Sequence, residues 1–586
     1  MKKALLLALA MTASTSLAAP FVWPAAWTAE QNTANKRGGE YRDYTIADFK
    51  TFNPFTSAEA TSIPGTMATG SSGLFMQNPS NDDFIPYMAA GEPVVSNNGK
   101  RFVVKIRPGM KFSDGQAITA DDFVTTMKIH MDDKVGSNSY DSFFLTKKPI
   151  TIKKIDNMTL QFDFPQVSSG AYGRMSFAPW PDHVFGKAYR AGGAEAIKKM
   201  WTLGTNPSEI VSPGMWTLNS YRAGERAVLS ENKFWGEWNK DSRGQALPYL
   251  DRYSFRIVSD LNAGLAAFLA GQIDAFAPRN ADDLAQIKRA VDAGNLKATL
   301  IANQSPTAAS QWIVFNWNKA SDPAKQKLFR DVRFRRAMSH LANRQAMIQL
   351  ALGGLGTENY YSVYPIFKQQ LAVAANAPKY PFNPEAASKL LAQMGYTKKN
   401  AQGFLVDKAG KVLEFNLSTN AGNTVREQLG RIFADEAKKV GVKVNFTPID
   451  FNNLVNQLTA KGENRPFDAI LLGLSGGSNV WSFGANVVPC GTNLHSYNNP
   501  TNGACATSQE QLMTKLYYQG DATLDGAKRR AIGAQILQAE GELQPVVYLV
   551  GGNYHVAYNE RLGGEFTKAM MDAYYGSRRI ALTFIK

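Results

Sequence analysis

Residues 101–127, RFVVKIRPGMKFSDGQAITADDFVTTM, constrain the fold most, because each part predicts a definite local structure. Apolar and basic residues alternate up to Arg107, the period of two expected of a strand with one buried face. Residues 113–115, Ser-Asp-Gly, then supply a turn. Thr119 predicts a helix start, because Asp122 three residues later forms an Asp variant of the capping box. A strand, a turn and a capped helix in one short stretch indicate mixed α/β structure.

The N-terminus predicts export. Two lysines precede an apolar run over residues 4–10, and a small-residue site ends at Ala18, so residues 1–18 form a predicted signal peptide. The run is too short to span a bilayer, and no later segment approaches the roughly 20 apolar residues of a membrane helix. We therefore expect a protein of the periplasm or cell envelope that is soluble after cleavage. No cysteine lies near the cleavage site, so a lipid anchor is not expected.

Length and charge narrow the class further. A chain of 586 residues is too long for one core and predicts several domains. The formal charge of +15 falls to about +13 without the two signal lysines, which favours anionic surroundings. The basic residues are spread out, with no run longer than pairs such as Lys438–Lys439, and no zinc-finger or RRM motif occurs. Nucleic-acid binding is therefore not expected.

The second half of the chain predicts an open α/β sheet. Residues 312–317 are an apolar strand, and residues 332–352 have the periodicity of a helix. Residues 411–417, 424–440 and 442–448 then predict strand, helix and strand. Such β-α-β crossovers are right-handed, and ligands of open α/β sheets bind beyond the strand ends.

Further motifs follow in a fixed order. They are PGMWTL with YRAGE in residues 213–225, NKFW in 232–235, PYLD in 248–251, AGQID in 270–274 and DVRFRRA in 331–337. Together with FSDG and TADD, they resemble the signature of the extracytoplasmic solute-binding proteins of family 5, which serve peptide and nickel ABC importers. Each motif is weak alone, but the family's order throughout the mature chain makes chance a poor explanation.

The resemblance implies an α/β, two-lobed fold of the periplasmic-binding-protein type (type II, large class), with lobes joined by crossover segments. A flexible leader is expected at residues 19–36, and the crossings near Trp312 and residues 545–548. The implied division is lobe I, discontinuous, at 37–75, 205–305 and 545–586; an added subdomain of lobe I at 76–204; and lobe II at 306–544.

The resemblance also implies a binding protein and no enzyme. Such a chain captures a peptide or peptide-like solute between its lobes and delivers it to the permease subunits of an ABC importer. A monomer without cofactor is expected. Peptide-binding relatives carry a cleft aspartate that pairs with the ligand's amino group, whereas here no acid occurs between Asp468 and Glu510. An oligosaccharide or another polar solute therefore stays open as the ligand.

The family's cleft strand, FDxxxxG, corresponds to residues 467–473, and the residues at its end are expected to touch the ligand. Glycines there let an extended ligand approach backbone N–H and C=O groups. These expected contacts are Gly473, Leu474, Ser475, Gly476, Gly477, Asn479 and Trp481. Further candidates are Asn420 and Gly422 in the turn after the strand 411–417, Trp312, and Thr61 with Ser62. The two tryptophans could instead pack in the core. Asn420 and Gly422 could instead serve only as turn or helix-cap residues.

Residues 473–477 also match GxSxG, the nucleophile elbow of serine hydrolases. Ser475 follows a strand, and His495 or His555 would complete a triad with Asp521 or Asp525. An elbow must lead directly into a helix, and residues 478–484 have no clean helical start. A secreted serine hydrolase using Ser475 remains the alternative of another class.

Cys490 and Cys505 flank a polar loop, and in an exported protein they are expected to form a disulfide. A metal site is the competing interpretation, but His495 is the only nearby histidine. The five histidines are scattered, and neither HExxH nor GxxxxGK[ST] occurs, so no metal or cofactor is expected.

Overall fold

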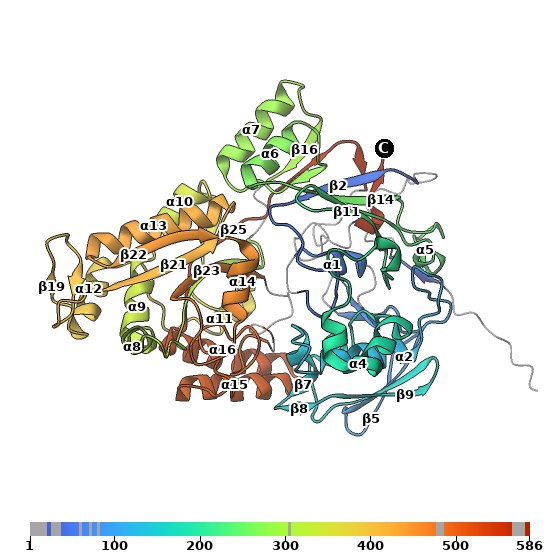
Figure 1. The fold of residues 1–586 in the computed structure, drawn as a ribbon, viewed down its shortest axis with the longest axis horizontal. Helices are drawn as coiled ribbons and strands as arrows, with labels where there is room; N and C mark the ends of the chain where they lie inside the picture. Colours follow the sequence, from blue (N-terminus) through green and yellow to red (C-terminus); the bar gives the residue numbers. More distant parts are fainter. Residues whose placement is uncertain are drawn as a thin grey trace, which may run out of the picture.

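The computed structural model describes residues 20–24, 37–57, 61–69, 73–78, 83–302, 306–475, 484, 486–564 and 580–586. Figure 1 shows two large bodies side by side, one built mainly from the first 250 residues and the other from residues 306–552. A smaller unit, residues 261–301, lies at the top of the view between them. Within the described ranges, no helix combines the length and apolarity that a membrane span requires.

A five-stranded sheet forms the centre of the second body, in the order β22-β21-β23-β17-β24. Its strands are β17 (Ala309–Phe315), β21 (Glu414–Asn420), β22 (Lys443–Ile449), β23 (Ala469–Ser475) and β24 (Val546–Tyr548). Strand β21 runs parallel to β22 and β23, while β17 is antiparallel to β23 and β24. The predicted crossover is confirmed, because α13 (Thr424–Val440) connects β21 to its parallel neighbour β22.

Further helices surround this sheet. They are α8 (Pro323–Arg330), α9 (Val332–Leu341), α10 (Arg344–Ala351), α11 (Lys368–Ala372), α12 (Pro384–Gln393), α14 (Phe451–Thr459), α15 (Ser508–Asp521) and α16 (Gly526–Leu543). Phe315 and Phe415 on the sheet pack against Phe329 and Phe334 on the helices, with ring centroids 5.1–6.3 Å apart. Phe329 belongs to α8 and Phe334 to α9, so these buried rings fix α8 and α9 to one face of the sheet.

The helix predicted at residues 332–352 is wrong in one respect, because it is interrupted. Helix α9 ends at Leu341, and Asn343 caps a new helix by accepting the N–H of Ala346 at 3.0 Å. The buried guanidinium of Arg344 then donates to the carbonyl of Tyr548 at 2.6 Å. The interruption thus anchors α10 to strand β24.

Two four-stranded sheets organise the first body. One runs β11 (Trp216–Arg222), β12 (Arg226–Glu231), β14 (Arg252–Ile257), β2 (Glu40–Thr45), and the other β5 (Val94–Ser96), β6 (Arg101–Lys105), β10 (Thr159–Asp163), β9 (Thr151–Asp156). The strand and capped helix predicted from residues 101–127 are confirmed as β6 and α2 (Ala120–His130). The Asp122 carboxylate accepts the N–H of Thr119 at 2.7 Å, and Ile118 and Phe123 are buried at the staple positions.

The smaller unit has its own core. Helices α6 (Leu261–Leu269) and α7 (Ala281–Asp292) pack beside β15 (Ala275–Phe276), β26 (Val556–Asn559) and β16 (Ala298–Ile301). The remaining α-helices of the described ranges are α1 (Ile63–Met67), α3 (Ala171–Arg174), α4 (Lys187–Lys198) and α5 (Trp235–Trp238). The remaining short strands are β1 (Phe21–Val22), β3 (Phe75–Gln77), β4 (Phe84–Pro86), β7 (Phe144–Leu145), β8 (Lys148–Pro149), β13 (Asn239–Lys240), β18 (Gly356–Glu358), β19 (Lys398–Lys399), β20 (Leu405–Val406), β25 (Val550–Gly552), β27 (Leu562–Gly563) and β28 (Phe584–Ile585).

Two observations differ from the segment boundaries expected from the sequence. Residues 20–24 belong to the fold and not to a loose leader, because β1 pairs with β13 and the buried Trp23 donates to Asn239 Oδ1 at 3.1 Å. Strand β24 belongs to the second sheet, although residues from 545 onward were assigned to lobe I. After β25 the chain passes through β26 of the smaller unit and returns to the core of the first body at β27. The rest of the division into lobes and subdomain stays a prediction.

Candidate functional site

A cavity that opens to solvent, with about 1120 Å³ of empty space, lies where the two bodies face each other. The first body contributes residues 45–48, Thr61 and Asn138. The second body contributes Asn420, Asn423, Arg426, Phe451, Val455, Leu458, Thr459, residues 472–474 and Leu494. The lining combines apolar side chains with a few polar groups, which is the composition typical of a solute-binding cleft.

Strand direction brings the polar groups of the second body together. Strands β21 and β23 are parallel, so their carboxyl ends, at Asn420 and Ser475, meet at one edge of the sheet. Strand β17 is antiparallel to β23, which places Gln311 directly opposite Gly473 at the same edge. The cavity therefore lies beyond the strand ends, as expected of an open α/β sheet.

An arginine is held at this edge by two amides. The Nε of Arg426 donates to Gln311 Oε1 at 2.8 Å, and its Nη1 donates to Asn420 Oδ1 at 2.8 Å. Burial lowers the pKa of Arg426 to about 10, so the side chain stays cationic at neutral pH. Gly473 leaves room for this arrangement, because a Cβ there would lie 2.8 Å from Gln311 Oε1 and 3.1 Å from Arg426 Nη2.

The structure brings four of the predicted ligand contacts to the cavity. These are Thr61, Asn420, Gly473 and Leu474, and their contact with a ligand stays a prediction. Ser475 is the exposed last residue of β23 and pairs with Ala309. Gly476, Gly477, Asn479 and Trp481 lie outside the described residues.

Three other predicted residues lie elsewhere. Trp312 is only 2% exposed and lines a smaller cavity of about 490 Å³ together with Tyr548. Ser62 accepts the N–H of Gly65 at 3.0 Å and caps α1. Gly422 has a positive φ of 80°, and its carbonyl accepts the N–H of Leu261 at 3.2 Å, so it joins the second body to the smaller unit.

Arg426, Gln311 and Leu494 were not predicted from the sequence. One signal could have identified Arg426. It lies in the first turn of a helix, where the positive end of the helix dipole disfavours a cation, and a basic residue there indicates a compensating role. Leu494 gives no such signal, because its position depends on the folding of the disulfide loop.

The residues proposed for a serine hydrolase are not assembled in the described part of the chain. Both ring nitrogens of His495 are occupied, Nδ1 by the carbonyl of Val487 at 2.9 Å and Nε2 by Glu510 at 3.2 Å. Ser475 is the last residue of strand β23, and the described range that contains it ends there. His555, the other histidine considered, is buried directly before strand β26 of the smaller unit.

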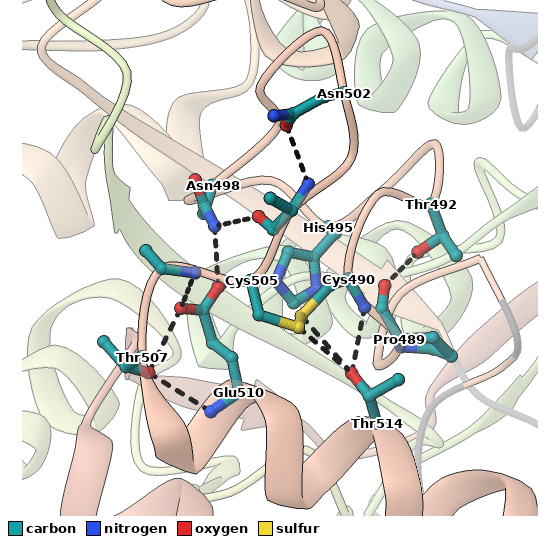
Figure 2. The surroundings of a disulfide bond; sticks show 12 residues. Pro489, Cys490, Thr492, His495, Asn498, Asn502, Cys505, Thr507, Glu510 and Thr514 are labelled. Atoms are coloured by element: carbon teal, nitrogen blue, oxygen red, sulfur yellow. Dashed lines mark hydrogen bonds and ion pairs between the residues drawn. A yellow bond between two sulfur atoms is a disulfide. The ribbon is translucent and has the colours of Figure 1, made fainter.

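Cys490 and Cys505 form the predicted disulfide, with an S–S distance of 2.09 Å (Figure 2). Thr514 contacts the bond from α15, since its hydroxyl accepts the N–H of Cys490 at 3.1 Å (Figure 2). His495 and Glu510 lie beside the disulfide as a fully buried pair. The loop is thereby fixed against α15.

Cys490, His495 and Glu510 also place possible metal-ligand atoms within 4.8 Å of one another. The sulfur of Cys490 is bonded to Cys505 and is no thiolate, however. Glu510 already accepts hydrogen bonds from His495, Asn498 and the backbone N–H of residue 506. Burial alone would raise the pKa of Glu510, but these bonds, led by that of His495, hold the pKa below its usual value. The cluster therefore stabilises the loop.

Comparison with known proteins places this geometry in a family. Residues 83–488 match the model of the bacterial extracellular solute-binding proteins, family 5, middle region. The chain is 46% identical over 602 aligned residues, covering both chains completely, to a probable ABC transporter-binding protein of Deinococcus radiodurans.

Two solved structures share the fold. The oligopeptide-binding protein AppA of Bacillus subtilis, in complex with a nonapeptide, superposes with a TM-score of 0.77 at 23% identity, covering 94% of this chain and 99% of that one. The periplasmic binding protein MelB of Agrobacterium fabrum, in complex with stachyose, gives 0.80 at 20% identity, covering 94% and 85%. Both similarities support the two-lobed α/β architecture. The family model matches more than half of this chain, and a relative aligns with it from end to end. This chain therefore belongs to family 5 of the bacterial extracellular solute-binding proteins.

Proposed function

We propose that this chain is the extracytoplasmic receptor of an ABC importer, and that it closes its two lobes on a peptide or peptide-like oligomer and delivers it to the permease. The observation that carries the proposal is the cavity between the bodies, lined by strand ends and turns from both. Gly473 exposes backbone there, and a backbone wall binds an extended ligand without demanding particular side chains. The similarity to a protein that holds a nonapeptide supports a peptide.

Contacts between the two bodies support closure as the working motion. The Nζ of Lys50 donates to Asn456 Oδ1 at 2.7 Å, from one body to the other. Arg174 and Asp521 form an ion pair of 3.2 Å, in which both side chains are less than 10% exposed. A ligand that touches both walls binds the closed state more tightly and shifts the population toward it.

The proposal includes export. The predicted signal peptide at residues 1–18 directs the chain across the membrane, and the mature receptor acts as a monomer in the periplasm or cell envelope. Family 5 is described as extracellular, which supports this placement.

An oligosaccharide is the second candidate ligand. The described end of the cleft strand, residues 469–475, carries no acid that would bind a peptide's amino group. Asn138, Asn420 and Asn423 supply neutral amides to the cavity, and Phe451 an aromatic face, a combination that suits hydroxyl-rich rings. The similarity to a stachyose complex supports this candidate.

Native mass spectrometry of the protein isolated from its own periplasm tests the proposal. We expect a bound mass that fragments as a peptide, and a melting temperature that falls once the ligand is removed by partial unfolding and dialysis. A bound mass that fragments into hexoses would contradict the peptide and favour the sugar. A chain without bound solute, whose melting temperature changes with neither peptides nor oligosaccharides, would refute the receptor function.

A further inference from the structure

The loop closed by the disulfide carries a set of metal-ligand atoms outside the cleft. One ligand atom each of Cys490, His495 and Glu510 lies within 4.8 Å of the others, and the sulfur of Cys505 is bonded to that of Cys490. Figure 2 shows these four side chains beside one another at the start of α15. Two sulfurs, an imidazole and a carboxylate are four ligands of the types that zinc takes at tetrahedral sites.

His495 is already oriented as zinc-bound histidines are. A carbonyl oxygen only accepts, so the contact of 2.9 Å between Nδ1 and the carbonyl of Val487 is an N–H donation by the imidazole. Nε2 is then the nitrogen that faces Glu510, at 3.2 Å. Histidines that bind a metal usually donate their other N–H to a carbonyl or a carboxylate, which fixes the ring and its tautomer. The backbone thus presents Nε2 as the metal-binding atom.

Glu510 is held by groups that do not involve the sulfurs. Its Oε2 accepts the N–H of Ala506 at 2.8 Å and the hydroxyl of Thr507 at 3.1 Å, and its Oε1 accepts Nδ2 of Asn498 at 2.8 Å. The side chains of His495 and Glu510 are both 0% exposed. Two of the four ligands are therefore fixed and desolvated before a metal arrives, which lowers the cost of ordering them on binding.

The disulfide keeps the site closed. A tetrahedral zinc ion holds two thiolate sulfurs about 3.8 Å apart on Zn–S bonds of about 2.3 Å, and a disulfide sulfur is no thiolate. The Cα atoms of Cys490 and Cys505 are 5.3 Å apart, so rotation about the two Cα–Cβ bonds separates the sulfurs once the bond is cleaved. The hydroxyl of Thr514, which is 3.3 Å from Sγ of Cys490, then donates to its thiolate. Neither cysteine is fully buried, so a reductant can reach the bond.

We propose that reduction converts this loop into a zinc site, in which Cys490, Cys505, Nε2 of His495 and Glu510 hold the ion. A dithiol supplies two electrons and two protons and is oxidised to its own disulfide. The bond between Cys490 and Cys505 breaks, and each sulfur becomes a thiol. Zinc then binds both sulfurs as thiolates together with Nε2 and the carboxylate, and the protons that it displaces pass to solvent.

This site goes beyond the proposed receptor function, but it bears on the wall of the cleft. Asn493 donates its N–H to Asp141 of the first body at 2.7 Å, and Leu494 lines the cavity. Both residues lie between the ligands Cys490 and His495 in the chain. A bound ion would tie the loop to α15 in place of the covalent crosslink, so zinc is expected to preserve this wall under reducing conditions.

Metal loading of the mature protein tests the inference. The protein is stripped with EDTA, reduced with tris(2-carboxyethyl)phosphine, separated from both reagents without oxygen, and given Zn²⁺ or Co²⁺. After gel filtration, elemental analysis should find about one zinc per reduced chain and almost none in the oxidised chain. Co²⁺ should give the intense visible absorption of a tetrahedral site and a thiolate charge-transfer band. With free zinc at about 100 times its dissociation constant, the melting temperature of the reduced protein should rise by about 5–11 °C over its value in EDTA.

Matched variants assign the ligands. Cys490→Ala/Cys505→Ala should bind no zinc at this loop with or without reductant. Glu510→Gln keeps the shape of the side chain and should bind zinc at least about tenfold more weakly. His183→Gln is the control, because His183 and Asp114 form another histidine–carboxylate pair, at 2.7 Å, in a chain that has only the two cysteines of the loop. This variant should bind zinc as the wild-type protein does.

Each outcome decides the inference. Reduced wild-type protein that has both thiols free but retains no zinc overturns it, and so does zinc that binds the oxidised chain equally well or is lost in His183→Gln. A cobalt spectrum typical of octahedral oxygen ligation also overturns it, and this measurement requires no variant to fold. Solute binding is measured separately on the oxidised protein, so the zinc site and the receptor function can each fail without the other.

Discussion

The disulfide between Cys490 and Cys505 closes the loop that supplies Leu494 to the cavity, and its removal has a calculable effect. The two cysteines are separated by 15 residues. In the chain-entropy relation, a crosslink over that span destabilises the unfolded chain by about 3 kcal/mol. The second body has roughly 240 residues, for which 1 kcal/mol corresponds to about 2–4 °C in melting temperature, so the loss is about 6–12 °C.

Removal of the crosslink should also weaken ligand binding. Asn493 of this loop donates its N–H to Asp141 of the first body at 2.7 Å, and Leu494 lines the cavity. A loop with more freedom must be ordered again when a ligand binds, which costs affinity. The double variant Cys490→Ala/Cys505→Ala should therefore melt lower and bind its ligand more weakly than the wild-type protein.

Differential scanning calorimetry with and without dithiothreitol is the assay. The melting temperature of the wild-type protein should fall when the disulfide is reduced. The double variant should not respond to dithiothreitol, and it thereby controls for effects of the reductant other than cleavage of the disulfide. The reasoning would be refuted if the double variant melted within about 2 °C of the oxidised wild-type protein, because the loop would then be held by its hydrogen bonds alone.

Three further predictions concern the fold. Phe315→Ala removes a fully buried ring from the second core and should lower the free energy of unfolding by about 3–5 kcal/mol in urea titrations, while an exposed site such as Leu524→Ala should change little. Asp274→Asn leaves Arg561 without its partner at 2.7 Å and should lower the free energy of unfolding by about 3 kcal/mol. Burial alone would raise the pKa of Asp274, but hydrogen bonds from arginines hold it below its usual value. The stability that Asp274 contributes should therefore persist above about pH 4 and vanish as acid titrations pass through the lowered pKa. Burial lowers the pKa of His130 to about 3, so between about pH 6.5 and that value its imidazole binds a proton in the unfolded chain but not in the folded one. His130 should therefore lower the free energy of unfolding by about 1.4 kcal/mol for each pH unit below about 6.5. A His130→Gln variant whose unfolding free energy fell as steeply as that of the wild-type protein between about pH 6.5 and 5 would contradict this.

Local signals in the sequence were sufficient for individual elements. The helix after Thr119, the crossover through α13 and the disulfide follow from capping residues, hydrophobic periodicity and cysteine context, all of which act over short distances. The interruption at Asn343 was missed, because apolar periodicity continues across it and the competing contacts of Arg344 come from strand β24, far along the chain.

The candidate site was predictable only in part. Asn420 and Gly473 stand at the ends of predicted strands, and the rule for open α/β sheets directed attention to them. Trp312 and Ser62 were expected near the ligand from the family resemblance alone, yet one lines a separate cavity and the other caps a helix. Sequence position does not reveal which way a side chain faces when neighbouring strands come from distant segments.

The sequence by itself determined the class of this protein, because family membership rests on motifs and caps whose local chemistry is the same in any context. Only the tertiary structure decided how the cleft is charged. Gln311, Asn420 and Arg426 lie on a strand, a strand end and a helix, and strand pairing brings them together. Whether a charge is balanced depends on every group within a few ångströms, and those groups are set by packing and not by sequence neighbours.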